Sequence, residues 1–243
     1  MSTNIVILGD GLLGSELHKQ TGWDIISRKK DGFDIRNPDN WDSYFFEREH
    51  GTVVYKKYNT IVNCIACTDT YSEDRDKHWQ VNYAGVVDLT DYCAREGIKL
   101  VHISTDYLYS LSDSHASEDD VPVHCKNWYG YTKLLSDGYV QLKGDDYLLI
   151  RSTHKREPFP YARAWAFQIG NFDYVSVIAD LIIKLINGNA TGVYNVGTED
   201  KTMYNLAART KPDVIMDDSF KLNHITAPHD VTMDIKRLHK FLK

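Results

Sequence analysis

The sequence lacks any long apolar run and any extended run of basic charge. No stretch of its 243 residues approaches the roughly eighteen apolar residues of a membrane-spanning helix, and the N-terminus shows no signal-peptide pattern. We therefore expect a cytoplasmic protein with no membrane partner. The net charge is −6, and the longest basic run, Arg28-Lys29-Lys30, is too short for a polyanion-binding face. Both features argue against a nucleic-acid partner.

Cysteine is also scarce. The four cysteines, Cys64, Cys67, Cys93 and Cys125, are typical of reduced thiols in a cytoplasm-like compartment. The Cys64-x-x-Cys67 spacing occurs in metal and redox sites, but no second pair lies at zinc-site spacing. We interpret these cysteines as buried structural residues and predict no metal site.

The sequence does contain a glycine motif close to its N-terminus. Residues 4–8 are a short apolar run rich in β-branched residues, and Gly9, Gly11 and Gly14 follow at G-x-G-x-x-G spacing before a helical pattern. This order predicts a strand, a tight turn and a helix whose first amides face a pyrophosphate. The alternative is a strand-to-helix turn that holds no ligand.

Apolar runs alternate with helical patterns along the chain. After the first strand, strand-like runs lie at residues 24–27, 60–64, 99–104 and 147–151. Such alternation indicates an α/β fold with a parallel sheet covered on both faces. We expect one helix from the Asn37 cap to about Glu49. A second should cover residues 74–96, with Trp79 on its apolar face and Gly97 at its end.

A tyrosine and a lysine stand four residues apart in a predicted helix. Tyr129 and Lys133 would share one helix face, and a cation near a phenol lowers the pKa of the phenol. The same spacing also occurs in ordinary exposed helix pairs. Ser104, Thr105 and Asp106 follow a strand at the sheet edge where ligands bind, although such residues are also common turn caps.

Together these motifs resemble the extended short-chain dehydrogenases/reductases, and within them the dTDP-4-dehydrorhamnose reductase branch. The pattern of that branch is Ser104-Thr105-Asp106-Tyr107 followed by Tyr129-Gly-x-Thr-Lys133-Leu. The resemblance implies a Rossmann-type doubly wound parallel sheet, with a dinucleotide-binding domain at residues 1–150 and a shortened substrate lobe at 151–243. It also implies a catalytic triad of Thr105, Tyr129 and Lys133, in which Lys133 bonds the nicotinamide ribose.

The cofactor residues follow from the same resemblance and from the second strand. Asp34 and Ile35 would lie along the adenine, and Ala66 and Thr68 would follow the next strand. No acid ends the second strand, so its basic turn favours NADPH, with dual use of NADH as the alternative. The expected cofactor-binding residues are Gly9, Gly11, Leu12, Leu13, Gly14, Ser27, Arg28, Lys29, Asp34, Ile35, Ala66, Thr68, Ser104, Tyr129 and Lys133.

The substrate lobe departs most from the family because the C-terminal third is short. Basic side chains there are expected to receive a substrate diphosphate, although ordinary surface charge is an equal alternative. The expected substrate residues are Asp106, Tyr107, Arg151, Lys155, Arg156 and Arg163.

Three functions are compatible with these residues. The first is an NADPH-dependent reductase of a 4-keto-6-deoxy sugar nucleotide, which the complete triad favours. The second is an epimerase or dehydratase of the same extended family. The third is a non-catalytic dinucleotide-binding regulatory subunit, as found in methionine adenosyltransferase. A homodimer is possible in each case.

Overall fold

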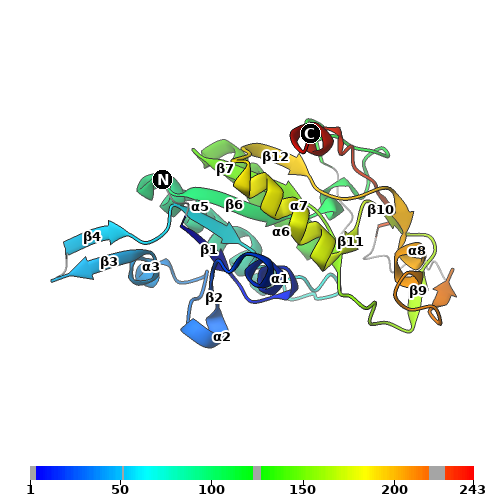
Figure 1. Ribbon diagram of the computed structural model, residues 1–243, viewed down its shortest axis with the longest axis horizontal. Helices are drawn as coiled ribbons and strands as arrows, with labels where there is room; N and C mark the ends of the chain where they lie inside the picture. Colours follow the sequence, from blue (N-terminus) through cyan, green and yellow to red (C-terminus); the bar gives the residue numbers. More distant parts are fainter. Residues whose placement is uncertain (1–3, 51, 123–126, 219–227) are drawn as a thin grey trace.

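A computed structural model describes residues 4–50, 52–122, 127–218 and 228–243 (Figure 1). It confirms the predicted fold class, because six parallel strands form one sheet between layers of helices. The strands lie in the order β12-β7-β6-β5-β1-β2. Their bounds are β1 Ile5–Leu8, β2 Asp24–Ile26, β5 Thr60–Asn63, β6 Lys99–Ser104, β7 Tyr147–Arg151 and β12 Gly192–Asn195.

Alternating residues of each central strand pack against different helical layers. Ile5 and Ile7 belong to one core cluster with helices α1 (Leu12–Thr21) and α7 (Val175–Asn187). Val6 and Leu8 belong to the second cluster with helices α3 (Trp41–Phe45) and α5 (Gly85–Glu96). On that same face, α6 (Trp128–Lys143) packs against α5. The two-residue period of a strand produces this division, so both sheet faces are apolar.

The strand order changes direction at β1. Strand β2 lies on one side of β1 and strand β5 on the other, both parallel to it. In a doubly wound sheet, this reversal leaves a crevice outside the carboxyl ends of the two central strands. The glycine motif follows β1, and Cys64 follows β5, so both reach this crevice.

The predicted helix beginning at Asn37 is shorter than expected. A 3₁₀ turn (Pro38–Asn40) and helix α3 (Trp41–Phe45) end where Phe46 takes an extended conformation. Strand β3 (Phe46–Glu49) then pairs with β4 (Thr52–Lys56) in a hairpin that projects from the sheet (Figure 1). The aromatic face of α3 is buried after a little more than one turn. The residues that follow form a strand by pairing with β4, which begins with the β-branched run Thr52-Val53-Val54.

The predicted helix over residues 74–96 is present in three segments. Helix α4 (Arg75–His78) leads into a π-helical turn (Trp79–Ala84) and then into α5, which ends at left-handed Gly97. Trp79 is 44% exposed, so its assignment to the apolar face is wrong. The π-helical turn changes which side chains face inward.

The C-terminal part of the chain adds a small lobe beside the sheet (Figure 1). Its own core cluster includes Phe159, Phe172, Tyr174, Met203 and Leu206. Strand β12 returns from this region to the main sheet, and α9 (Lys236–Phe241) packs there through Leu238. The remaining elements are α2 Arg28–Asp31, the 3₁₀ turn Asp106–Tyr109, β8 His154–Lys155, β9 Arg163–Trp165, β10 Ile169–Gly170, β11 Asp173–Tyr174, β13 Lys201–Thr202, α8 Met203–Ala208, β14 Ile215–Asp217 and β15 Asp230–Val231.

Three of the four cysteines lie in the described ranges, and all three are free thiols. Cys67 and Cys93 are buried, Cys64 is partly buried, and Cys125 lies outside the described residues. Within those ranges, no helix has the length and apolar character needed to cross a membrane. The same residues contain no group of three or more His, Cys, Asp or Glu side chains placed to hold a metal ion.

Replacing Gly14 by Ala should lower the free energy of unfolding by about 1–3 kcal/mol through overpacking. An added Cβ at Gly14 would stand 2.0 Å from the Gly9 carbonyl oxygen. Gly138→Ala is the matched control, because this helical position has nothing within 4 Å of an added Cβ. It should stabilise the protein by about 0.5–1 kcal/mol. Urea unfolding measures both, and equal stabilities would contradict the close approach.

Candidate active site

The glycine turn is shaped to receive an anion. Gly9 has a φ of +97°, and Gly14 packs directly on the Gly9 carbonyl. Gly11 is the N-cap of α1, and no described side chain caps the first amides of this helix. The space where a Gly11 Cβ would stand is open. The first amides of α1 are therefore free to bind a pyrophosphate in the crevice, so these residues fit a dinucleotide.

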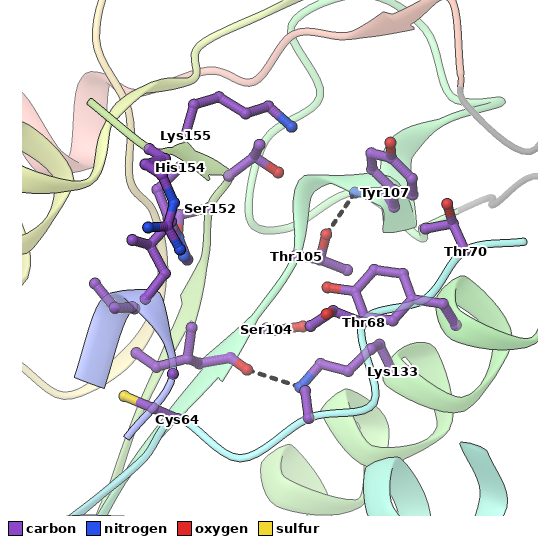
Figure 2. Close-up of a pocket in the computed structure, with 18 of the residues that line it drawn as sticks. Cys64, Thr68, Thr70, Ser104, Thr105, Tyr107, Lys133, Ser152, His154 and Lys155 are labelled. Carbon is purple, nitrogen blue, oxygen red and sulfur yellow. Dashed lines mark hydrogen bonds between the residues drawn. The ribbon is translucent and has the colours of Figure 1, made fainter. Parts of the chain in front are cut away.

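A cavity of about 520 Å³ opens in front of this turn (Figure 2). Its walls come from the glycine turn, the ends of β5, β6 and β7, helix α6, and the segment after β7. Figure 2 shows Lys133 on the wall opposite Ser152, His154 and Lys155. The lining residues are Gly11, Leu12, Leu13, Cys64, Ala66, Thr68, Thr70, Ile103, Ser104, Thr105, Tyr107, Tyr129, Lys133, Ser152, Thr153, His154, Lys155, Arg156, Pro160 and Tyr161.

Thr105, Tyr129 and Lys133 all line this one cavity. Thr105 directly follows β6, and its hydroxyl accepts a hydrogen bond from the Tyr107 amide at 3.2 Å and donates one to Asp106 Oδ1 at 3.3 Å. Helix α6 begins at Trp128 because the Asn127 side chain caps the Gly130 amide at 2.6 Å. This start places Tyr129 in the first turn and Lys133 one turn later on the same face.

Burial controls the titration of the phenol and the amine. It raises the pKa of Tyr129 to about 12, while the Thr105 hydroxyl lowers that pKa and the Asp106 carboxylate raises it. The expected lowering of the Tyr129 pKa by Lys133 is therefore wrong. Burial also lowers the pKa of Lys133 to about 8, against the opposing field of Asp137. An amine that is partly neutral cannot offset the desolvation of a phenolate.

A second cavity of about 260 Å³ adjoins the first and shares Gly11, Cys64 and Ala66 with it. Asp34 and Ile35 line this second cavity. The Arg36 guanidinium bonds the Asp34 carboxylate, with Nε to Oδ1 at 2.9 Å, and lowers its pKa to about 2. The sequence analysis did not identify Arg36 or Lys77, which also line this cavity.

The basic turn after β2 only partly reaches the second cavity. Arg28 lines it and forms an ion pair with Asp34, with Nε to Oδ2 at 3.3 Å. Ser27 is buried and caps α2, since its hydroxyl accepts from the Lys30 amide at 3.2 Å. Neither Ser27 nor Lys29 belongs to the lining, so Arg28 is the residue of the Ser27–Lys29 turn that lines this cavity.

Comparison with known proteins identifies the family. Residues 3–154, more than half of the chain, match the family described as RmlD substrate binding domain. The chain belongs to this family. The match confirms the reductase-like branch of the extended short-chain dehydrogenases/reductases that the motifs indicate.

Several relatives of this RmlD family chain have been described. SpsK, a spore coat polysaccharide biosynthesis protein of Bacillus subtilis, is 27% identical over 213 residues, which cover 80% of this chain and 73% of SpsK. A dTDP-4-dehydrorhamnose reductase of Mycobacterium tuberculosis is 33% identical over 114 residues, 44% of this chain and 34% of that protein. A dTDP-4-dehydrorhamnose reductase of Bacillus anthracis, solved in complex with NADP, has a TM-score of 0.81 at 22% identity, covering 99% of this chain and 92% of its own. This last similarity concerns the fold.

Three expected substrate residues do not reach the cavity of this RmlD family member. Arg151 is 1% exposed and forms a buried ion pair with Asp137, with Nη2 to Oδ1 at 3.0 Å. Arg163 lies in the small lobe and pairs with Asp217 at 3.2 Å. Asp106 is fully buried beneath the cavity lining. These side chains turn toward partners that are distant in sequence or toward the core, which strand-end position alone does not reveal.

The remaining substrate residues and several unexpected ones do line the cavity. Tyr107, Lys155 and Arg156 belong to the lining, as expected. The polar run Ser152, Thr153 and His154 follows β7 and was not predicted, although its position at the carboxyl end of a central strand was a usable signal. Thr70, Pro160 and Tyr161 lie in loops, and no sequence pattern distinguishes them.

Arg151 and Arg163 provide a matched pair of stability tests. Arg151→Met leaves the Asp137 carboxylate buried without its guanidinium partner, so the free energy of unfolding should fall by about 3–5 kcal/mol. Arg163→Met removes a pair whose arginine is exposed, so that free energy should change by at most about 1 kcal/mol. Denaturant unfolding compares the two. A milder loss for Arg151→Met than for Arg163→Met would contradict the structural role.

Proposed function

We propose that this chain is an NADPH-dependent reductase of a 4-keto-6-deoxy sugar nucleotide. The observation that carries the proposal is the content of a single cavity. It brings the glycine turn at the start of α1 together with Thr105, Tyr129 and Lys133, and it adds the cations Lys155 and Arg156 on the facing wall. A dinucleotide site, a proton donor and an anion anchor are the parts that such a reduction requires.

The two adjoining cavities provide room for an extended cofactor. The α1 amides would bind the pyrophosphate, the second cavity would hold the adenosine half, and Lys133 would bond the nicotinamide ribose in the first. When bound, the reduced nicotinamide supplies the hydride that reduces the substrate carbonyl. The open position at Gly11 supports this placement, since any side chain there would enter the pyrophosphate space.

Tyr129 would protonate the carbonyl oxygen as charge develops on it. Because burial raises the pKa of the phenol to about 12, Tyr129 carries its proton at neutral pH and begins as an acid. Thr105 would hold the same oxygen from the end of β6, since its hydroxyl also lines the cavity. General acid catalysis of this kind contributes about a hundredfold to ten-thousandfold in rate.

Lys155 and Arg156 would anchor the substrate diphosphate. The Lys155 amine makes no hydrogen bond or ion pair with any residue in the described ranges, although it lines the cavity. Burial lowers the pKa of Lys155, and the Asp106 carboxylate opposes that effect. A partly desolvated cation without a partner favours binding of an anion. These two residues replace Arg151 and Arg163 in the anchoring role.

Initial rates of NADPH oxidation test the proposal directly. The purified chain is assayed with dTDP-, UDP- and GDP-linked 4-keto-6-deoxy sugars, and one of them should support turnover. A regulatory dinucleotide-binding subunit would instead bind NADPH without oxidising it in the presence of any of these sugars. An epimerase or dehydratase would convert a sugar nucleotide without net cofactor oxidation. The expected homodimer stays a prediction, which the mass in solution would check.

Tyr129→Phe should lower kcat by about a hundredfold to ten-thousandfold, because it removes only the proton donor. The Kd for NADPH should stay within about twofold, because a lost phenol hydroxyl removes no phosphate contact. Rates come from cofactor absorbance and Kd from fluorescence titration. Turnover near the wild-type level would exclude Tyr129 as the acid.

Arg28→Asp should weaken NADPH binding by about tenfold to 150-fold while sparing NADH, because a charge-assisted bond is worth about 1.5–3 kcal/mol. Lys29→Asp makes the same change in charge outside the second cavity, so it should affect NADPH far less. Titrations of both variants with NADPH and NADH distinguish a direct contact with the 2′-phosphate from a general electrostatic effect of the added negative charge. Equal weakening by the two variants, or equal losses for NADPH and NADH, would rule out the role of Arg28.

A further inference from the structure

A chain of hydrogen bonds runs behind Lys133, away from the cavity. The Ile65 amide donates to Asn63 Oδ1 at 3.1 Å, and Asn63 Nδ2 lies 3.2 Å from His102 Nδ1. His102 Nε2 lies 3.1 Å from Lys133 Nζ. All three side chains are buried, at 0%, 0% and 1% exposure for Asn63, His102 and Lys133. The ends of β5 and β6 are thus tied to α6 by side chains that are almost fully buried.

The first bond of this chain determines the next ones. Because Asn63 Oδ1 accepts from a backbone amide, the Asn63 nitrogen faces His102 and donates to Nδ1. Burial and the nearby Lys133 lower the pKa of His102 well below its ordinary value, so the ring is neutral. A neutral imidazole that accepts at Nδ1 carries its proton at Nε2. That proton points at Lys133 Nζ.

This arrangement is complete only when Lys133 is a neutral amine. A neutral amine has a lone pair that accepts from Nε2–H, and it still donates to the Ile103 carbonyl oxygen at 2.7 Å, a bond drawn in Figure 2. An ammonium has no lone pair. A Lys133 ammonium would need His102 to accept at Nε2, so the ring proton would have to lie on Nδ1. That proton would face Asn63 Nδ2, which is also a donor, and the His102–Asn63 bond would be lost.

We propose that His102, held in its Nε2–H tautomer by Asn63, is a positioning residue that sets the proton affinity of the Lys133 amine. None of these hydrogen bonds involves Tyr129. They lie behind the cavity wall, where the ends of β5 and β6 meet under α6.

The other charged and titratable groups around Lys133 are few. Asp137, one turn further along α6, favours the ammonium, but its carboxylate is shared with Arg151 and Ser104. Cys64, at the end of β5, also favours the ammonium when ionised, yet burial raises the pKa of this thiol to about 12. Tyr129 lies one turn back on α6. His102 is therefore the neighbour whose tautomer opposes the ammonium.

The consequence for turnover depends on the proposed function. After Tyr129 gives its proton to the substrate oxygen, the phenolate must be reprotonated. An ammonium at Lys133 can return a proton to the phenolate and become an amine, and the amine then takes a proton from solvent. By favouring the amine, His102 lowers the pH at which Lys133 exchanges its proton and makes it an easier donor to Tyr129.

The tautomer can be measured in the full chain without any substrate. Long-range 1H–15N spectra of the wild-type protein show which ring nitrogen of a histidine carries the proton, and the His102 ring signals are assigned through bonds from the His102 backbone in uniformly labelled protein. We expect a protonated Nε2 and an unprotonated Nδ1 at about pH 9.5, above the Lys133 pKa of about 8, where Lys133 is a neutral amine. An Nδ1–H tautomer or an imidazolium would overturn the proposal, and the wild-type spectrum is decisive however the variants fold.

Two variants then test the effect on Lys133. Asn63→Asp keeps an acceptor for the Ile65 amide but accepts from His102 Nδ1–H, which leaves Nε2 free to accept from an ammonium. His102→Gln offers an amide oxygen to Lys133 and adds no charge. Each should raise the Lys133 pKa by about one to two units, followed through the Lys133 13Cε signal. An unchanged pKa in a folded variant, or a rise in Asn63→Asp alone, would overturn the role of the tautomer.

The pH profile of kcat separates this inference from the proposed function. If both are correct, the alkaline limb moves upward with the Lys133 pKa in both variants. If the NMR results hold but no ketosugar is reduced, the proposed function fails and the His102 to Lys133 coupling stands. If a ketosugar is reduced but the alkaline limb of the kcat profile does not move in the folded variants, the proposed effect of His102 on Lys133 is wrong. The proposed reductase function is then still supported.

Discussion

The carboxyl edge of the central sheet is buried between helices and the small lobe, and this burial determines most of the site. A polar group taken out of water must find a partner or cost free energy. Among the described residues, Asp106 Oδ2, Ser152 Oγ and His154 Nδ1 are buried without a hydrogen bond. Three chains of bonds supply partners to the other polar groups behind the cavity. One joins Arg151 to Asp137 and Ser104, one joins Thr105 to Asp106 and Thr153, and one joins Asn63 to His102 and Lys133. The Lys155 amine, which belongs to none of these chains and has no other described partner, faces the cavity.

The same burial gives the reacting groups their acid and base character. It raises the pKa of Tyr129 and lowers the pKa of Lys133, so a protonated phenol stands one turn from an amine that exchanges protons near neutrality. It also raises the pKa of Asp106 to about 6, although the Thr153 and Thr105 hydroxyls lower it. These groups lie close together in a region largely removed from water. A change in one hydrogen bond there alters the pKa of the group that makes it.

Local patterns predicted much of this fold. The strand bounds follow from short β-branched runs, and the glycine motif follows from its position between the first strand and α1, where Gly14 packs on the Gly9 carbonyl. The helix expected up to Glu49 was wrong in its second half, because residues 46–49 pair in a hairpin with the β-branched strand β4. The main strands and the glycine turn are predictable because adjacent residues determine them. The end of the helix at Phe45 is not, because it depends on pairing with β4.

The site was less predictable than the sheet. The direction of Arg151 depends on Asp137, which belongs to another element, so strand-end position placed the residue but not its side chain. The shift in the Tyr129 pKa was predicted with the wrong sign. Residue spacing reveals a neighbouring lysine, but it does not reveal how deeply the phenol is buried. Arg36 and Lys77 reach the second cavity from separate segments that only the folded chain brings together.

The central claim is that this cavity performs hydride transfer to a sugar carbonyl. The most direct test incubates the chain with NADPH carrying deuterium at the transferable C4 position and the 4-keto-6-deoxy sugar nucleotide panel, followed by mass spectrometry of the products. One product should be heavier by a single deuterium at the reduced sugar carbon, and Tyr129→Phe should form it at least about a hundredfold more slowly. Tight NADPH binding with no deuterium in any sugar would contradict the central claim.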